Sequence, residues 1–364
     1  MTQENVGEAD MAVEKNPFVI TFGKKPIEYI SRPHQTEQIL EMFMTDPITN
    51  QVYIICGPRG SGKTVLLSDI ANTLEEDPEW LVIRCAPTSN ILQVIAEGLR
   101  RSTRYGKMKV DANIHIPMIG SVSVSHLTPG HNEASDLYQI EDLLKKLGEK
   151  GKKILITIDE VTNTPQMQDF VSNLQLWMSR ELPVFFLGTA LYERIEELQN
   201  VANLTFLYRA PKINLAPLDM PSIARSYQKA LNVSEERSLQ LAKLTQGYSF
   251  AFQALGYIYW NAKPVDNIER ILPDYDVMLS NAAYSKMWQE MSPGDHALCV
   301  AISECSSNKV SDIRKGMNDP DSNRFNQRRI RLKNQGMINT SERGKITFTL
   351  PRFKEFVKMQ MFFV

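Results

Sequence analysis

The sequence has few cysteines, no long apolar run and no excess of either charge. Its four cysteines among 364 residues stand singly, without the paired spacing of a zinc site, and are interpreted as buried reduced thiols. No apolar run approaches the roughly 18 residues of a membrane span, and Met1 to Glu14 lacks the basic start and apolar stretch of a secretory signal. We therefore expect a soluble, cytoplasmic protein with no membrane partner and a flexible tail over residues 1–16.

The balance of charge argues against a protein coated generally by nucleic acid. The chain carries 41 Lys and Arg against 42 Asp and Glu, a net charge of -1. A total near zero can still hide a basic patch on one domain, so the position of each charge matters more than the sum. The length predicts two or three domains.

Apolar runs alternate with helical patterns over residues 17–216. Strands alternating with helices predict an α/β fold with a parallel five-stranded sheet covered on both faces. The predicted strands are Val52–Cys56, Trp80–Cys85, Ile154–Ile158, Val184–Leu187 and Ile213–Leu215. The period-two pattern over about 110–130 predicts an inserted β-hairpin, either a decoration at the solvent edge or a contact for nucleic acid or a partner.

After Pro217 the pattern is helical. We interpret residues 217–275 as a helical lid and 276–364 as a winged-helix domain. The second assignment depends on three helical patterns, over 293–305, 310–317 and 323–335, followed by two short strands around residues 341–344 and a final helix after Pro351.

A P-loop follows the first predicted strand directly and precedes an amphipathic helix. Its glycines let backbone amides turn toward phosphate oxygens, and the helix N-terminus adds partial positive charge. Lys63 is expected to reach the β- and γ-phosphates and Thr64 to bind Mg²⁺. The expected ligand is ATP with Mg²⁺, bound by Gly57, Pro58, Arg59, Gly60, Ser61, Gly62, Lys63 and Thr64.

Two acids follow the third apolar run, in the segment Ile154 to Glu160. Asp159 is expected to hold Mg²⁺ through its water shell, and Glu160 to orient and deprotonate the attacking water. Taken alone, two acids after a strand are weak evidence. A further strand between the P-loop strand and this one favours the additional-strand ATPases over nucleotide kinases and GTPases.

At this point the sequence resembles AAA+ and STAND P-loop ATPases, above all archaeal and bacterial ATPases similar to origin-recognition initiators. The resemblance covers nearly the whole chain. It extends over the lead-in NPFVITFGKKP with Arg32, the P-loop, the acidic motif, Gly188-Thr189, the segment YRAPKINLAPL, the lid and the winged helix.

The resemblance implies two further catalytic residues. Thr189 would act as a sensor of the γ-phosphate or water, with an ordinary strand-end residue as the alternative. Arg209 would be an arginine finger for a neighbouring subunit, with a surface arginine as the alternative. Where AAA+ lids often carry a sensor arginine, residues 247–253 (GYSFAFQ) contain no basic residue, which predicts slow hydrolysis and a switch-like use of nucleotide.

Positive charge gathers between residues 324 and 345. In a winged helix the third helix enters the major groove and the wing meets the backbone, so this charge predicts double-stranded DNA as a partner. The helix is expected to bury Phe325, Ile330 and Leu332 and to turn Arg324, Arg328, Arg331 and Gln335 to one face. The candidate DNA contacts are Arg324, Arg328, Arg331, Arg343 and Lys345.

The sequence thus predicts an ATP-hydrolysing switch that binds DNA in replication, transposition or a mobile-element process. A STAND-type signalling or defence ATPase that acts through protein oligomerisation is the alternative, as a homo-oligomer or with a protein partner. A nucleotide-binding scaffold with negligible turnover is the third hypothesis.

Overall fold

A computed structural model describes residues 15–21, 26–45, 47–104, 133–198, 200–201, 204–317 and 321–362. The hairpin predicted at 110–130 and most of the predicted tail lie outside these residues. The chain divides into two compact units, one of residues 1–30, 217–291 and 350–364, the other of residues 31–216 and 292–349. The predicted domain limits stay a prediction.

The second unit contains a five-stranded parallel sheet in the order β2-β3-β4-β1-β5. The strands are β1 (Val52–Cys56), β2 (Trp80–Cys85), β3 (Lys153–Ile158), β4 (Val184–Ala190) and β5 (Lys212–Asn214). In space β4 lies between the P-loop strand β1 and the acidic strand β3. This order confirms the predicted fold class and its additional-strand type. The structure extends β4 three residues beyond the prediction, to Ala190.

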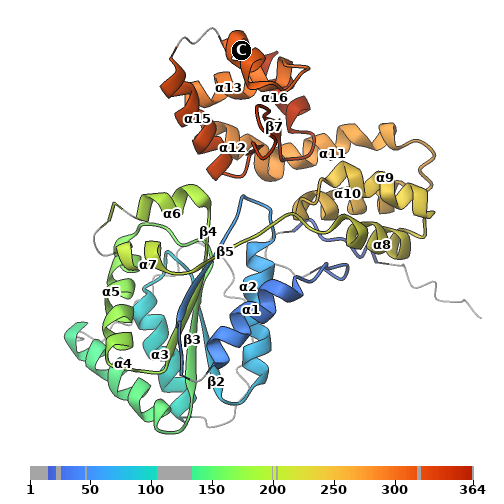
Figure 1. The fold of residues 1–364 in the computed structure, drawn as a ribbon. Coiled ribbons are helices and arrows are strands. Elements are labelled where there is room, and N and C mark those ends of the chain that lie inside the picture. Colours follow the sequence, from blue (N-terminus) through green and yellow to red (C-terminus); the bar gives the residue numbers. More distant parts are fainter. Residues whose placement is uncertain are drawn as a thin grey trace, which may run out of the picture. The chain divides into compact units, whose positions relative to one another are not determined.

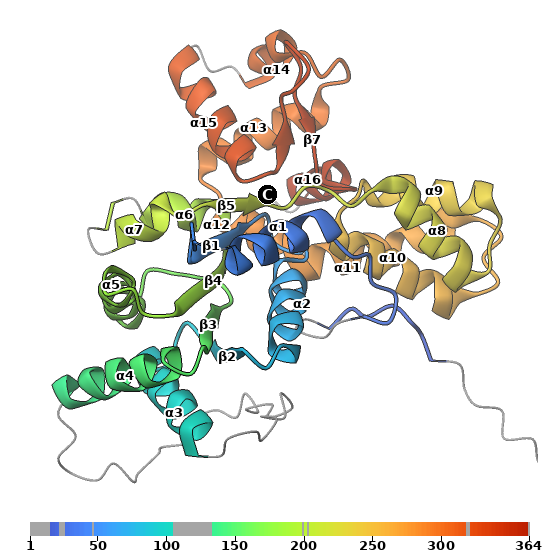
Figure 2. The ribbon, with the colours of Figure 1, turned by 60° about the horizontal axis from the view of Figure 1, so that its bottom comes forward.

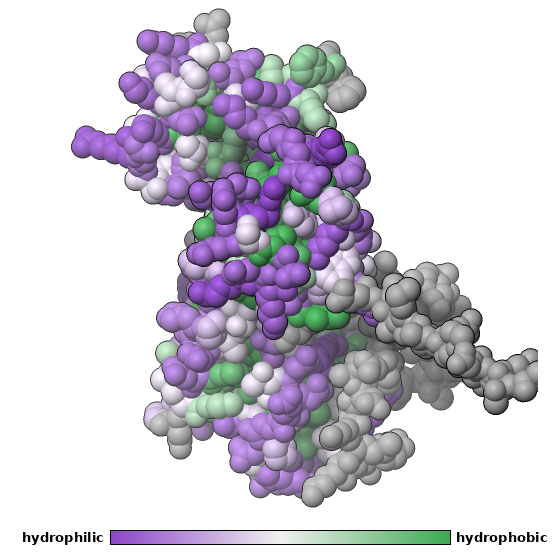
Figure 3. All heavy atoms as spheres, turned by 90° about the vertical axis from the view of Figure 1, so that its right-hand side faces the viewer, coloured by the Kyte–Doolittle hydropathy of each residue, from purple (hydrophilic) through white to green (hydrophobic). Residues whose placement is uncertain are grey.

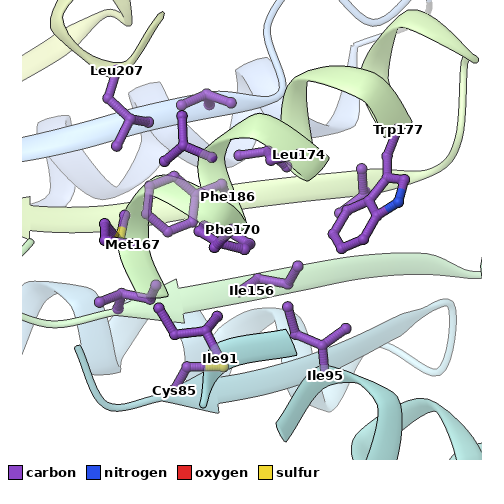
Figure 4. Close-up of a cluster of buried hydrophobic side chains, with 14 of the residues drawn as sticks. Cys85, Ile91, Ile95, Ile156, Met167, Phe170, Leu174, Trp177, Phe186 and Leu207 are labelled. Atoms are coloured by element: carbon purple, nitrogen blue, oxygen red, sulfur yellow. The ribbon is translucent and has the colours of Figure 1, made fainter. Parts of the chain in front are cut away.

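Helices cover both faces of the sheet, as Figure 1 shows. One face carries α3, α4 and α5, and the other carries α1 and α2. Each layer is held by its own apolar cluster: Phe170 and Phe186 pack edge to face in the first, with ring centroids 5.2 Å apart (Figure 4), and Phe43 and Phe185 pack likewise in the second, at 5.2 Å. The helices around the sheet are α1 (Pro33–Met44), α2 (Lys63–Glu76), α3 (Ile91–Arg104), α4 (Glu133–Gly148), α5 (Pro165–Ser179), α6 (Tyr192–Leu198) and α7 (Thr205–Arg209).

Residues 292–349 form three helices and a small antiparallel sheet, grouped together in Figure 2. The helices are α13 (Pro293–Glu304), α14 (Val310–Met317) and α15 (Ser322–Asn334), and the strands are β6 (Ile338–Asn339) and β7 (Thr347–Phe348). A single bridge adds Lys309 beside Lys345. The order of helices and strands is the predicted one.

The first unit is helical. It consists of α8 (Met220–Leu231), α9 (Glu235–Thr245), α10 (Ser249–Ala262), a 3₁₀ turn η2 (Ile268–Ile271), α11 (Leu272–Leu279), a π-helical segment η3 (Ser280–Tyr284), α12 (Ser285–Glu290) and α16 (Phe353–Met361). Phe18 packs against Tyr227 and Phe252 in its core. Arg352, directly before α16, pairs with Asp276 of α11 at 2.5 Å.

The described part of the chain contains no helix that combines the length and the apolar character needed to cross a bilayer. The face in Figure 3 is mainly hydrophilic, with small separate hydrophobic areas.

Candidate nucleotide site

The P-loop connects β1, all of whose residues are buried, to the first turn of α2. Gly60 and Gly62 have φ values of 70° and 93°, the left-handed region that glycine adopts without a steric penalty. At Gly57 a Cβ atom would lie 2.7 Å from the Ser61 Oγ, closer than packing allows. These glycines therefore fit the tight loop whose backbone amides can surround a phosphate.

Lys63 is buried at the start of α2, with 7% of its surface exposed. Its Nζ donates hydrogen bonds to the carbonyl oxygens of Gly57 at 3.0 Å and Pro58 at 2.9 Å, so the ammonium group lies along the loop. Burial lowers the pKa of Lys63 to about 8, although the carboxylates of Asp159 and Glu160 oppose this shift. The site therefore holds a cation that a phosphate would stabilise further.

Nucleotide binding should weaken as pH rises above about 8. Only protonated Lys63 attracts phosphate, and a bound phosphate raises its pKa, so binding at high pH requires uptake of a proton. We expect the dissociation constant for ADP to be flat near pH 7 and to rise toward about tenfold per pH unit above pH 8 to 9. Titration of a fluorescent ADP measures this, and Lys63→Arg, whose charge persists to higher pH, should remove the rise. Equal affinity of the wild type from pH 7 to about 9.5 would contradict the assignment of Lys63.

A chain of hydrogen bonds joins the P-loop helix to the ends of β3 and β4. The Thr64 hydroxyl donates to Asp159 Oδ2 at 2.8 Å, and the Thr189 hydroxyl donates to Asp159 Oδ1 at 2.5 Å. The Glu160 amide in turn donates to the Thr189 hydroxyl at 2.9 Å. Parallel pairing of Ile158 with Gly188 sets this arrangement, because it brings the residues after β3 beside Thr189. The predicted Mg²⁺ residues thus lie together.

Mg²⁺ fits the oxygen atoms gathered here. It prefers hard oxygen ligands and commonly binds one or two protein groups, completing its shell with water and phosphate. Thr64 and Asp159 supply a hydroxyl and a carboxylate oxygen in contact with each other. No group of three or more His, Cys, Asp or Glu side chains suited to a metal occurs within the described ranges.

The buried Arg32 ties the P-loop to the segment that follows β5. Its guanidinium donates to the Ala216 carbonyl oxygen at 2.7 Å and to the Ser61 carbonyl oxygen at 3.2 Å. Sequence reasoning included Arg32 only through the family resemblance and assigned it no role. A buried arginine bonded to two backbone carbonyls separated by 155 positions can be identified only once the fold brings them together.

The two residues whose roles the resemblance implies lie in different surroundings. Thr189 is fully buried in β4 and its hydroxyl is bonded to Asp159, so it orients the acidic strand. Arg209 ends α7 and is exposed, and it takes no part in the hydrogen-bond chain described above. Both roles remain predictions.

The lid residues that lack a basic side chain lie at the start of α10. Gln253 carries the side-chain amide in this stretch. It accepts a hydrogen bond from the Val19 amide at 2.9 Å and donates one to the Glu28 carbonyl oxygen at 2.6 Å. Its amide group is therefore used inside the helical unit.

The basic helix α15 differs from its predicted orientation. Phe325 and Leu332 are buried as expected, but Ile330 is 52% exposed, so its predicted burial is wrong. The reason is angular: Ile330 lies on the side of the helix opposite the buried pair, which the described residues of this module leave exposed.

Two of the arginines assigned to the outward face of α15 pack onto α13 instead. Arg331 donates to Asp295 at 2.5 Å and to the Ser292 hydroxyl at 3.0 Å, and Arg328 lies over Gly294, where a Cβ atom would come within 2.5 Å of its Nε. Asp295 is 2% exposed and forms the capping box of α13, so its buried carboxylate requires a cation.

Nearby acids also pair with other members of the basic set. Arg324 lies 3.1 Å from Asp321, and Lys345 lies 2.5 Å from Glu342. Arg343, in the turn between the two strands, is exposed. The four residues predicted to share one contact face of α15 are therefore not all available to bind phosphate.

A parallel sheet in this order, with a P-loop after β1 and an acidic pair after β3, defines an additional-strand P-loop domain. Residues 48–195 match a family model described as AAA domain, and residues 281–357 match a domain of unknown function, DUF8462. The chain is 22% identical to an ATP-binding protein of Methanocaldococcus jannaschii described as uncharacterized, over 37% of this chain and 42% of that relative's length. Residues 48–195 are thus similar to AAA domains, and the chain spans less than half the length of the relative that it matches.

Solved structures share the fold at low identity. The Walker-type ATPase of Pyrococcus abyssi has a TM-score of 0.64 at 14% identity, with 91% of this chain and 96% of that chain covered. The ORC2 protein of Aeropyrum pernix, solved as ADPNP–ADP complexes, has a TM-score of 0.58 at 11% identity, with 94% and 98% covered. These likenesses confirm the predicted resemblance to origin-recognition-like P-loop ATPases at the level of fold.

Proposed function

We propose that this protein binds ATP with Mg²⁺ and hydrolyses it slowly, as a conformational switch. The observation that carries the proposal is the hydrogen-bond chain from Thr64 through Asp159 and Thr189 to the Glu160 amide, next to the buried ammonium of Lys63. The ORC2 protein of similar fold was solved with nucleotide, which supports the same ligand here.

Each residue of the site has a proposed task. The backbone N–H groups of the loop over residues 59–64 surround the phosphates, and Lys63 neutralises charge on the β- and γ-groups. Thr64 and Asp159 hold Mg²⁺, which when bound withdraws charge from the phosphate oxygens. Glu160 accepts the proton of a water whose oxygen attacks the γ-phosphorus while the bond to ADP breaks. Phosphate release from ATP by wild-type protein, compared with Glu160→Gln, tests the proposal.

We expect slow turnover because the lid brings no cation that could stabilise the transition state of hydrolysis. The lid segment 247–253 contributes no cation, and Arg209 would act on the nucleotide of another subunit. A cation that acts on the transition state contributes orders of magnitude in phosphoryl transfer, so its absence from the lid favours long-lived ATP and ADP states.

We propose further that residues 292–349 form a winged helix that associates with double-stranded DNA, in replication, transposition or mobile-element movement. Support comes from the helix and strand order and from the exposed cations in the turn and along α15. Because Arg331 pairs with Asp295 and Arg328 packs over Gly294, the proposed phosphate contacts centre on Arg343 in the exposed turn.

Arg343→Ala should weaken DNA binding about three- to tenfold and reduce the slope of log affinity against log salt by about 1, because one phosphate contact is lost. Fluorescence anisotropy with a duplex at several salt concentrations measures both quantities. Lys229→Ala, an exposed lysine on α8, is the control and should change neither. If wild-type protein with ATP shows no salt-dependent binding at low salt, the DNA proposal fails. Nucleotide-dependent oligomerisation in the same samples would then support the STAND-type reading.

A further inference from the structure

Arg59 is the charged residue in the middle of the P-loop, two positions before the Ser61 whose carbonyl Arg32 holds. Its side chain is 26% exposed, and its Nη1 lies 3.8 Å from Glu160 Oε1. The same guanidinium is near Lys63, since its charge is one of the influences that lower the pKa of Lys63. Arg59 therefore lies between the phosphate-binding loop and the acid proposed as the general base.

The backbone of Glu160 is fixed, whereas its side chain is not. The residue has a φ of 58°, in the left-handed region. Its amide donates to the Thr189 hydroxyl, and the next amide, of Val161, donates to the Thr189 carbonyl oxygen at 2.7 Å. The Glu160 side chain is 61% exposed. Rotation about its side-chain bonds can therefore move the carboxylate while Thr189 holds the chain in place.

Arg59 can interact with two kinds of anion, the Glu160 carboxylate and the phosphates of a bound nucleotide, and the phosphates carry more charge. The Glu160 carboxylate carries one charge at 3.8 Å, while a triphosphate bound by the P-loop would bring several charges and bidentate acceptors for a guanidinium. A carboxylate held by a guanidinium is less free to turn toward a water and orient it. Pairing with Arg59 and service as general base are thus competing states of Glu160.

We propose that Arg59 is a positioning residue that restrains Glu160 and releases it to bound triphosphate. This inference rests on the proposed function, because it assigns Arg59 a role through Glu160. While the pair is intact, the carboxylate is turned toward the P-loop. Phosphate oxygens of bound ATP compete for the guanidinium and draw it away for part of the time, and only then can Glu160 orient the attacking water, so the restraint still limits kcat at saturating ATP. The device limits basal turnover without a contribution from the lid.

Steady-state phosphate release at saturating ATP and Mg²⁺ tests the restraint. Arg59→Gln removes the charge, so kcat should rise about three- to tenfold while KM rises no more than a few-fold. Arg59→Lys keeps the charge but loses the planar fork, and should give a smaller rise in kcat. Arg194→Gln, on α6 and paired with Glu197, makes the same change of charge outside the site and should leave both constants unchanged.

A double variant shows whether the effect of Arg59 on kcat acts through Glu160 or through an unrelated change in the site. Arg59→Gln combined with Glu160→Gln should be as slow as Glu160→Gln alone, because the gain acts through Glu160. The inference is overturned if Arg59→Gln lowers kcat or leaves it unchanged, or if it accelerates turnover equally when Glu160 is already replaced. Failure of the proposed function has a different signature: Glu160→Gln then releases phosphate at the wild-type rate, whatever stands at position 59.

Discussion

Replacing Lys63 by alanine should abolish ATP and ADP binding at micromolar protein concentration. The buried ammonium is the cation that we propose the P-loop offers to the phosphates, and losing a charged donor costs about 3 kcal/mol or more, at least a hundredfold in affinity. Isothermal titration with ADP and with a non-hydrolysable ATP analogue measures the loss. Lys150→Ala, at an exposed lysine far along the chain, should bind like wild type.

Thermal unfolding distinguishes this effect from misfolding. Because burial lowers the pKa of Lys63 to about 8, its charged form is disfavoured in the folded state, and this cost is present at neutral pH and relieved as pH rises from about 8 toward 10.5. Alanine removes the cost, so the unfolding temperature of Lys63→Ala at pH 7 should not fall. Retained nucleotide affinity in a folded Lys63→Ala protein would refute the site assignment.

Glu160→Gln should reduce turnover about 10²- to 10³-fold while nucleotide affinity changes only a few-fold, because the amide keeps the shape but cannot accept a proton. The substitution leaves intact the residues that we propose bind the phosphates and Mg²⁺, namely Lys63, Thr64 and Asp159. Single-turnover phosphate release with radiolabelled ATP measures the chemical step apart from product release. Glu149→Gln, an exposed glutamate after α4, is the matched control. Equal rates in wild type and Glu160→Gln would favour the hypothesis of a nucleotide-binding scaffold with negligible turnover.

Most of the sheet was predictable because β1 to β4 consist largely of apolar residues. Strands buried on both faces appear as continuous apolar runs, and β1 and β2 begin and end where the sequence places them. β4 was predicted to end at Leu187 because Gly188 and Thr189 are not apolar. Its last residues are held by pairing with Ile54 to Cys56, a long-range contact without a local signal.

The nucleotide site was predictable as a set of residues but not as a network. A P-loop is local, since its glycines, lysine and threonine occur within eight positions. The bonds of Thr189 to Asp159 and of Arg32 to Ser61 and Ala216 depend on strand order and on the path of the chain after β5. The spacing of residues along the sequence predicts neither the strand order nor this path.

The basic helix shows the opposite error, in which a local pattern was given too much weight. Counting charges between residues 324 and 345 left out Asp295, which lies about thirty positions earlier and binds Arg331. Burial of Ile330 was inferred from its apolar character, but Ile330 lies about half a turn of helix away from the side of Phe325 and Leu332 and is exposed. A cluster of like charges predicts a phosphate surface only after its internal partners are known.

The division of the chain between its units constrains how the protein can be shortened. The helical unit is interrupted after Met291 and resumes at Leu350, so the intervening segment is an insertion joined at both ends. A stop codon after Met291 would also delete α16, and with it the ion pair of Arg352 with Asp276 and the edge-to-face contacts of Phe353 and Phe356 with Tyr284. Genetic removal of the segment proposed to associate with DNA therefore calls for an internal excision that joins residue 291 to residue 350, rather than for early termination.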